Sequence, residues 1–394
     1  MATTNIIVHR KFQIKSQTRR YVMGGFFILV GLLIYLLFAA QTSATAMTKF
    51  VMTPGGIDRG VMGDWIFQTR TALYILAGAS LLAGIYQLAR GFAGWANPVL
   101  GIVVAGFVFC FLAWSAADKQ LNLAGMLSSA VLLSVPIVLA AFSGVISERA
   151  GVVNIAIEGM MLMGAMVGAL VGSVTRSTWL GLFAAIISAM LLAWLHGMLS
   201  IKYRINQIVS GTVINIFSTG MTSFLSQKFL QPYEYLNAPP MFTRIPIPVL
   251  SDIPLIGPLF FNTNLFVYAM FIFLIVLQVV YFSTKWGLRM RSVGEHPKAA
   301  DTLGINVIKT RYTAVLLSGA MAGFAGAFYT LASVGRFDEE MTAGKGFIGL
   351  AAMIFGNWTP IGAAGAGLLF GFADSMASKV SLIGSNVPPQ IMAM

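Results

Sequence analysis

Long segments without a charged side chain recur along almost the whole of this sequence, and no other feature limits its possible folds as strongly. Nine of these runs are long enough for a helix to cross a bilayer, which takes about 20 residues. A tenth, 159–175, is long enough if its helix begins near Gly151. The nine longer runs are 21–48, 71–89, 91–117, 120–147, 177–201, 205–227, 253–284, 312–335 and 346–373. The sequence therefore predicts an all-α, polytopic membrane helix bundle with about ten transmembrane spans.

Composition and charge agree with a membrane location. Only 10% of the residues are charged and 57% are hydrophobic, against about 25% charged in soluble domains. With the N-terminus inside, the inner segments hold 16 Lys and Arg and the outer segments hold nine, which the positive-inside rule favours. The net charge of +12 is then an orientation signal and an attraction to anionic membrane lipid, not to nucleic acid. We expect a multi-pass protein of the cell membrane with a cytoplasmic N-terminus.

The chain divides into two predicted regions. Residues 1–122 form an N-terminal membrane extension of about three spans without a chemical constellation, and residues 123–394 form the core. The apolar run 21–40 follows a basic start but exceeds the roughly 7–15 residues of a signal-peptide core, so we expect a permanent first span. The outer loop 228–262 holds seven of the 14 prolines and is therefore stiff. It is either a landing surface for an extracellular binding protein or an ordered cap over the helices.

The segment 285–311, between two uncharged runs, is more than a polar loop. It carries six Lys and Arg against two acidic residues, which places it in the cytoplasm. Pro297 is suited to open a helix and Gly304 to end one. Between them lies a small apolar face formed by Ala299, Ala300 and Leu303. A short helix of this kind is suited to docking into a cleft of another protein.

Three sequence blocks carry a resemblance to a known family. RSVGEHPKAADTLGI, within 285–311, resembles the coupling loop of ABC-transporter permeases, above all the branch that imports simple sugars and nucleosides. SERAGVVNIAIEGMMLMGA at 147–165 resembles the signature of nucleoside-type permeases, and TAGKGFIGLAAMIFGNWTPIGA at 342–363 is similar to the C-terminal motif of that branch. The blocks stand in the family's order and spacing, and the resemblance covers roughly 125–394.

The resemblance implies a transporter subunit and its partners. These would be a second permease in a hetero- or homodimer, two cytoplasmic ATP-binding subunits, and an extracytoplasmic solute-binding protein, often a lipoprotein in the nucleoside branch. It assigns ATPase coupling to Gly294, Glu295, His296, Pro297, Ala299, Ala300, Leu303 and Gly304. Because family members usually continue with another span after a segment such as SLIGSNVPPQIMAM, we expect this chain to be truncated at its C-terminus.

No catalytic, cofactor or metal-binding constellation is visible in the sequence. A phosphate-binding loop GxxxxGK[ST] is missing, because Gly344-Lys345-Gly346 lacks both the spacing and the hydroxyl. The single cysteine, Cys110, permits no disulfide within the chain, and the three histidines lack metal-ligand spacing. We expect His196 to be packed among helices. The chain is therefore predicted not to be an enzyme, and ATP hydrolysis is expected on a separate subunit.

Polar side chains inside the predicted spans are candidates for the substrate path. Asn154 and Glu158 lie four residues apart, on one face of a helix expected to start near Gly151. The run 205–227 carries a polar stripe at helical spacing: Gln207, Gly211, Asn215, Thr219, Thr222 and Ser226. We assign Asn154, Glu158, Gln207, Asn215, Thr219 and Thr222 to the substrate path. The alternatives are that Glu158 caps a helix and that the stripe is hydrogen-bonding glue between helices.

The predicted spans offer amides, hydroxyls and aromatics but almost no fixed charge. A neutral, hydrogen-bonding solute fits this inventory, because a charged one needs a counter-charge at low dielectric. The segment 346–356 is too short to span and is either part of a kinked crossing or a half-helix before a full one. Two rival functions remain open: an ion-coupled secondary transporter, for which only Glu158 offers an in-span carboxylate, and a membrane scaffold without transport activity.

Overall fold

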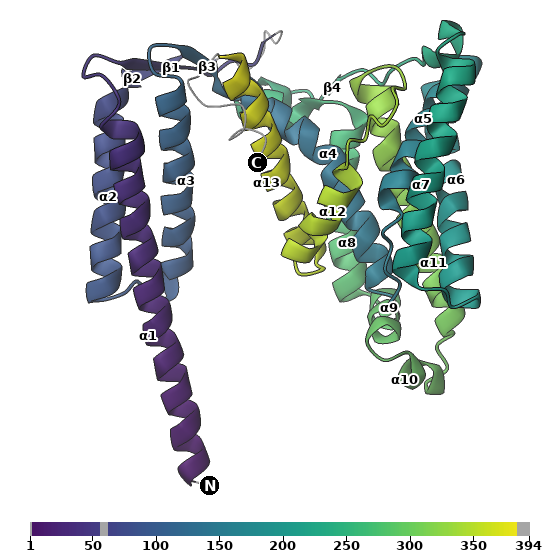
Figure 1. Cartoon of the computed structure of the whole chain (residues 1–394), viewed down its shortest axis with the longest axis horizontal. Coiled ribbons are helices and arrows are strands. Elements are labelled where there is room, and N and C mark those ends of the chain that lie inside the picture. Colours follow the sequence, from purple (N-terminus) through teal and green to yellow (C-terminus); the bar gives the residue numbers. More distant parts are fainter. Residues whose placement is uncertain (1, 56–61, 384–394) are drawn as a thin grey trace. The chain divides into compact units, whose positions relative to one another are not determined.

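A computed structural model describes residues 2–55 and 62–383 and divides them into two compact units. One unit holds the described residues up to Gly125 and those from Ala377 onward, and the other holds 126–376. Among the described residues, ten helices are long and apolar enough to cross a membrane. This number and the dominance of helix confirm the predicted all-α, polytopic class (Figure 1). The division into an N-terminal extension, 1–122, and a permease core, 123–394, stays a prediction.

The N-terminal unit is a three-helix cluster with a small sheet at one end (Figure 1). Its helices are α1 (Ala2–Leu33, continued by a π-turn at Ile34–Ala39), α2 (Thr69–Ala89) and α3 (Ala96–Ser115). Its strands are β1 (Met47–Val51), β2 (Trp65–Gln68) and β3 (Gln120–Asn122). Strand β1 is central, antiparallel to β2 with Met47 opposite Gln68, and parallel to β3 with Lys49 opposite Gln120.

The sheet lies at the end of the first uncharged run, 21–48. The helical chain ends at Ala39, in agreement with the expected first span at 21–40, and Met47 and Thr48 lie in β1. Buried Phe50 of β1 contacts the rings of Trp65, Phe67 and Phe109. Burial of these aromatic rings stabilises the pairing of short strands that would be marginal alone.

The core unit consists of helices α4 to α13, apart from residues 123–125 of α4 and 377–382 of α13, which fall in the N-terminal unit. The bounds are α4 Leu123–Glu148, α5 Ile157–Thr175, α6 Thr178–Gly197, α7 Gln207–Leu225, α8 Leu265–Ser283, α9 Lys285–Glu295, α10 Pro297–Thr302, α11 Val307–Phe328, α12 Lys345–Phe355 and α13 Pro360–Leu382. Single π-turns extend α6 to Lys202, α7 to Leu230 and α11 to Ser333. The outer loop adds one antiparallel pair, β4 (Ile245–Pro246) and β5 (Asn262–Thr263).

Polar caps set where the helices of the core unit begin. A Ser, Thr or Asn side chain that accepts hydrogen bonds from the first free backbone N–H groups stabilises a helix start by about 1 kcal/mol. Five helices begin in this way, at Ser177, Asn206, Asn264, Thr284 and Asn306. The cap at Asn264 explains why the run 253–284 is helical only from Leu265 onward.

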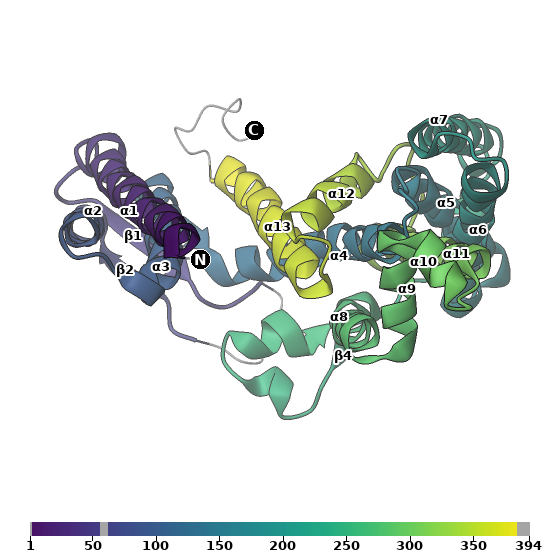
Figure 2. The same cartoon turned by 90° about the horizontal axis from the view of Figure 1, so that it is seen from below.

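Helices α5, α6 and α11 pack through their glycine faces, and Figure 2 shows them together with α7 in one group. A Cβ on Gly164 would lie 3.0 Å from the Cα of Gly323, and one on Gly172 would lie 3.8 Å from the Cα of Gly181. Glycines stand four residues apart in 164–172 and in 319–323. This spacing in the sequence predicts close helix contacts, and the structure has them there.

The C-terminal helices decide between the two alternatives left open for 346–373. Helix α12 is a separate half-length helix and α13 is a full one. Helix α13 runs antiparallel to α4, since Gly371 contacts Ser134 and Ser375 donates a hydrogen bond to the carbonyl of Met126. Lys379 therefore lies toward the start of α4, not toward its end beside α9. Lys379 was expected on the same side as 285–311. Moving it to the other side changes the count of Lys and Arg from 16 inner and nine outer to 15 inner and 10 outer.

Candidate functional site

The centre of the core unit is an irregular stretch between α4 and α5, which we call the junction segment (residues 149–156). The sequence predicted a helix starting near Gly151, but Gly151 has φ = +79° and α5 starts only at Ile157. Backbone polar groups without helical partners are costly at membrane depth unless the protein satisfies them. The side chains around the junction segment do so.

Two side chains bind the backbone of Val153. Its N–H donates to Oε1 of Gln207 at 2.7 Å. Its carbonyl lies 3.0 Å from Nε2 of His196, whose Nδ1 lies 3.0 Å from the hydroxyl of Ser210. His196 is fully buried, and its two partners fix the tautomer, because a carbonyl can only accept. The expectation that His196 is packed among helices is confirmed.

Asn215 joins α7 to the junction segment and to the first turn of α5. Its amide nitrogen donates to the carbonyl of Ile155 at 2.9 Å, and its amide oxygen accepts from the N–H of Gly159 at 2.8 Å. Gly211, one turn before Asn215, lies so close that a Cβ there would be 3.0 Å from the backbone nitrogen of Ala156. The amide groups of the predicted stripe are thus bound to backbone.

Asn154 lies in the junction segment itself and is fully buried. Its amide nitrogen donates to the hydroxyl of Ser318 in α11 at 2.9 Å, and its amide oxygen accepts from the N–H of Ala156 at 3.1 Å. The hydroxyl of Ser318 is in turn 2.8 Å from that of Ser143 in α4. This buried network ties two helices, α4 and α11, to the junction segment, and such networks specify one arrangement when every member is satisfied.

Glu158, in the first turn of α5, holds the N-terminus of α12. Its carboxylate accepts hydrogen bonds from the hydroxyl of Thr342 (2.6 Å) and from the N–H groups of Gly344 (2.9 Å) and Gly346 (2.6 Å). A carboxylate at a helix N-terminus is stabilised both by free N–H groups and by the helix dipole. The block at 147–165 therefore meets the block at 342–363, and the geometry agrees with the helix-capping alternative.

Lys345 of α12 and Asp374 of α13 form a half-buried ion pair. Asp374 was not among the predicted site residues, because the last uncharged run ends one residue before it. Because Asp374 pairs with Lys345, neither charge is isolated within the span. Neutralisation of this kind is expected where ionisable groups lie in a membrane span.

The turn between α12 and α13 is fixed to the end of α4. The indole N–H of Trp358 donates to Glu148 at 2.6 Å, and Nε of Arg149 donates to the carbonyl of Trp358 at 2.8 Å. Both Asn357 and Trp358 have positive φ, a conformation that non-glycine residues rarely adopt without such support. On its other side the backbone of Arg149 contacts Gly294 at the end of α9, where a Cβ has no room. The junction segment therefore touches the proposed coupling loop directly.

The coupling loop forms the two helices α9 and α10 (Figure 1). As predicted, Pro297 opens the short helix, and Gly304 follows its end with φ = +79°. The N–H groups of Gly304 and Ile305 donate to the carbonyls of Asp301 and Ala300, which is a Schellman motif.

The apolar face of α10 differs from the prediction in one residue. Ala300 is buried, with 2% of its surface exposed, whereas Leu303 is 81% exposed. Since α10 packs on α9 and α11 through Ala300, only Ala299 and Leu303 remain on the outer side. Of the other residues assigned to coupling, Gly294 is half-buried, Glu295 and His296 are exposed, and Pro297 is half-buried.

The last two path residues lie further along α7. Thr222 is buried and its hydroxyl donates to the carbonyl of Ser218 within the same helix, while Thr219 is half-buried. The structure thus brings Asn154, Glu158, Gln207 and Asn215 together around the junction segment, and leaves Thr219 and Thr222 one to two turns away.

A polar cavity of about 440 Å³ lies at the end of the core unit away from α9 and α10. It is formed where α8 begins, α11 ends and α4 begins. The residues that offer it amides, hydroxyls and aromatic rings include Ser128, Phe242, Asn262, Asn264, Phe328 and Ser333. Arg244 is the charged residue in its lining. Such a lining suits a solute that stacks and forms hydrogen bonds.

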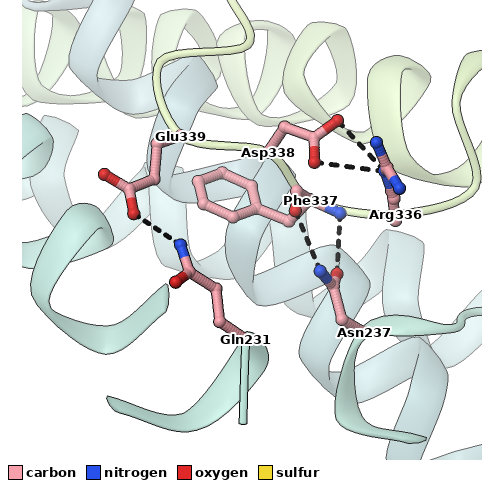
Figure 3. A network of polar contacts seen from close by, with 6 residues as sticks. All are labelled: Gln231, Asn237, Arg336, Phe337, Asp338 and Glu339. Atoms are coloured by element: carbon pink, nitrogen blue, oxygen red, sulfur yellow. Dashed lines mark hydrogen bonds and ion pairs between the residues drawn. The ribbon is translucent and has the colours of Figure 1, made fainter. Parts of the chain in front are cut away.

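The same end of the core carries an ordered network between the segments after α7 and after α11 (Figure 3). Asn237 accepts from the backbone N–H of Phe337 and donates to its carbonyl, at 2.7 and 2.9 Å. Gln231 donates to Glu339, and Arg336 pairs with Asp338 at 3.1 Å. This part of the loop 228–262 is therefore an ordered cap. Among the described residues, no group of His, Cys, Asp or Glu is arranged to hold a metal ion.

The described residues include ten helices apolar enough to cross a membrane, and those of the core unit meet at the hydrogen-bonded junction segment, so the fold is that of a multi-pass membrane protein. The model of the family described as "Branched-chain amino acid transport system / permease component" matches residues 126–392. The chain belongs to this permease family, which confirms the recognition of an ABC-transporter permease, and it is a multi-pass protein of the plasma membrane.

Three relatives illustrate the similarity. The chain is 40% identical over 260 residues to the guanosine ABC transporter permease protein NupQ of Bacillus subtilis, covering 64% of this chain and 80% of that protein. It is 41% identical over 271 residues to the nucleoside ABC transporter permease protein NupC of Lactococcus lactis, with 67% and 84% covered. A putative glucose ABC transporter permease protein, TsgC13 of Haloferax volcanii, is 37% identical over 266 residues, with 68% and 80% covered. No solved structure matches the chain significantly.

Proposed function

We propose that this chain is the permease subunit of an ATP-driven importer that carries nucleosides across the plasma membrane. The observation that carries the proposal is the similarity of about two thirds of the chain to permeases named for guanosine and nucleosides, at 40% and 41% identity. The cavity lined by amides, hydroxyls and aromatic rings, with Arg244 as its charged residue, supports a solute with a base to stack and hydroxyls to bind.

The solute is tested by competition for uptake. Cells that express the complete transporter should take up labelled guanosine, and excess unlabelled nucleosides should reduce that uptake at least tenfold. Glucose at the same excess should leave it unchanged. Equal inhibition by glucose, or no nucleoside uptake above that of cells lacking the chain, contradicts a nucleoside substrate.

The partner subunits are the second part of the proposal. Relatives from three organisms occur as two permeases with one transporter name, and the chain is closer to one of each pair. The identities are 40% and 26% in B. subtilis, 41% and 23% in L. lactis, and 37% and 24% in H. volcanii. This pattern supports a heterodimer with a different second permease, and the ordered cap of Figure 3 offers a firm surface for an extracytoplasmic solute-binding protein.

ATP hydrolysis is proposed on separate cytoplasmic subunits that receive Leu303 of α10 in a cleft. Leu303→Glu should lower co-purification of the ATPase and reduce uptake at least tenfold, because a charge then enters an apolar contact. The matched control is Leu288→Glu, the same change on an exposed residue of α9. Normal ATPase association in Leu303→Glu, or equal loss in both variants, contradicts docking through α10.

The orientation of the chain is tested with introduced cysteines in a Cys110→Ser background. Thr302, in the coupling loop, and Val249, in the loop 228–262, are both exposed. A cysteine at Val249 should react with an impermeant thiol reagent in intact cells, and one at Thr302 should react only after lysis. Labelling at Thr302 in intact cells reverses the proposed topology, including the cytoplasmic N-terminus.

The substrate path is proposed to run along the junction segment and α7. Asn154, Glu158, Gln207 and Asn215 would position the wall of this path through the hydrogen bonds described above, and Thr219 and Thr222 would continue it along α7. Movement of α9 and α10 would reach the wall through the contact of Gly294 with Arg149. ATP binding would thereby bias a two-state equilibrium between inward- and outward-open forms.

A further inference from the structure

The N-terminal unit contains a basic hollow, which is separate from the proposed substrate path. A hollow of about 760 Å³ lies where α1 passes the end of α2 and the start of α3. Arg19 and Arg20 of α1 and Arg90 at the end of α2 line it, with Gln87 and Gly91 beside them. Three arginines from two helices thus meet at one end of the unit.

These arginines have no carboxylate partner among the described residues. The sequence contains no Asp or Glu in 1–57 or in 65–117. Arg20 donates to the carbonyls of Leu88 and Ala89 at the end of α2, and Arg19 donates to the side chain of Asn97. These hydrogen bonds hold the side chains of Arg19 and Arg20 in place at the lining of the hollow. Arg90 is exposed, its backbone N–H donates to the carbonyl of Tyr86, and its guanidinium has no hydrogen bond or ion pair among the described residues.

Exposed aromatic residues mark the depth of the hollow in the membrane. Tyr21 is 57% exposed, Tyr86 46% and Trp95 72%, and all three are close in sequence to the arginines. Exposed Tyr and Trp at helix ends are typical of the layer of lipid headgroups. The next residue pointing outward on α1, Val22, is 66% exposed and apolar, as expected for contact with acyl chains.

We propose that this hollow binds the headgroup of an anionic phospholipid. Basic pockets between transmembrane helices recognise such headgroups, because arginine forms charge-assisted, bidentate hydrogen bonds with phosphate oxygens. The lipid phosphate lies between Arg19 and Arg90, where it neutralises charge that the protein leaves uncompensated. Its acyl chains cover the apolar faces of α1 and α2.

The test uses the full-length chain purified in detergent and delipidated. Phosphatidylglycerol, phosphatidylcholine and inorganic phosphate are added separately, and native mass spectrometry and thermal unfolding are recorded. Phosphatidylglycerol should be retained at least fivefold more than phosphatidylcholine and should raise the unfolding temperature. Arg90→Gln breaks no internal bond and should reduce this preference at least threefold, and the double change Arg19→Gln with Arg90→Gln should abolish it.

Arg70→Gln is the matched control, since Arg70 lies at the opposite end of α2 and contacts Tyr74. It should retain the preference of the unmodified chain. Equal retention of the two lipids, an unchanged preference in Arg90→Gln, or the same loss in Arg70→Gln overturns the proposal. Stabilisation by inorganic phosphate equal to that by phosphatidylglycerol also overturns it, because the hollow would then be a site for a free anion.

Discussion

The N-terminal unit and the core unit are both built from apolar helices, but they are held together by different means. In their most apolar stretches, α2 and α3 bury 28% of their residues within the protein, whereas α4 buries 83% and α11 buries 78%. The N-terminal unit has close glycine contacts between α1 and α2, since a Cβ on Gly84 would lie 2.9 Å from the backbone nitrogen of Ile28, but Gly78 and Gly101 have open space where a Cβ would stand. Gly346 and Gly349 of the core have backbone or side-chain atoms there. Close packing around α4 and α11 thus distinguishes the core from α2 and α3.

The two units also differ in the treatment of charge. The core carries carboxylates inside the bundle, and each has a donor: Glu148 has Trp358, Glu158 has the start of α12, and Asp374 has Lys345. The N-terminal unit pairs Lys49 with Asp64, but the cluster of Arg19, Arg20 and Arg90 has no carboxylate partner among the described residues. The contrast indicates that the core uses charge to fix a specific arrangement, whereas the N-terminal unit leaves charge for a partner outside the chain.

The largest expected difference in uptake between the two units comes from a Gly→Ala substitution in each. In Gly346→Ala the new Cβ would lie 2.6 Å from Oε2 and 2.7 Å from Cα of Glu158, so α12 must move away. We expect uptake to fall at least tenfold and the unfolding temperature to drop. Gly78→Ala should change neither, and a similar loss in both variants removes the distinction between the units.

Glu158→Gln tests whether the core depends on the charge of its carboxylate. The amide keeps the shape but directs an NH₂ group at one of the backbone N–H donors. Hydrogen bonds to a charged group contribute about 1.5–3 kcal/mol each, so we expect about a tenfold loss of uptake and a lower unfolding temperature. The control is Glu340→Gln, the same change on an exposed residue. Full activity of Glu158→Gln argues that the N-terminus of α12 is held by packing alone.

A matched pair of tryptophans compares the units with a smaller change. Trp358→Phe removes the N–H that binds Glu148 and leaves a half-buried carboxylate without this donor, at a cost of about 1–3 kcal/mol. Uptake should fall severalfold. Trp95→Phe, at a residue 72% exposed, should retain normal uptake. Equal effects of the two changes contradict a specific role for the turn between α12 and α13.

The smallest effect is expected at the polar stripe of α7. Asn215→Leu loses two hydrogen bonds of about 1 kcal/mol each, so uptake should fall severalfold while the ATPase stays bound. A cysteine at Thr219 should react with a small hydrophilic thiol reagent, and excess nucleoside should protect it. If that cysteine is inert in every state and Asn215→Leu transports normally, the stripe is only glue between helices.

Periodicity and turn chemistry were sufficient to predict much of this fold. The ten spans follow from run length, α10 follows from Pro297 and Gly304, and the close helix contacts follow from glycine spacing. The prediction of helix bounds failed where an uncharged run continued through a segment that is not helical. The run 253–284 includes an irregular stretch before Asn264, and 346–373 includes two helices, because hydropathy does not distinguish a helix from buried irregular backbone.

The site residues were found more readily than their roles. Spacing alone placed Gln207 and Asn215 on one face of a helix. That face packs against the junction segment, which could not be predicted because irregular backbone leaves no periodic pattern in the sequence. Asn154 and Glu158 were expected on one helix, but the chain is irregular after Gly151 and α5 begins only at Ile157, so Asn154 lies before the helix. Ala300 was assigned to an exposed face because an alanine is compatible with both sides of a short helix.

The energy source distinguishes the proposed importer from an ion-coupled transporter. The ion-coupled alternative requires in-span carboxylates free to bind a coupling ion. Glu158 instead accepts three hydrogen bonds and Asp374 pairs with Lys345.

The most direct test is nucleoside uptake by proteoliposomes that contain this chain, its second permease, the ATPase subunits and the binding protein. Uptake should require ATP on the side of α9 and α10 and should persist when ionophores remove proton and sodium gradients. Uptake driven by either gradient in proteoliposomes without the ATPase subunits would contradict the account.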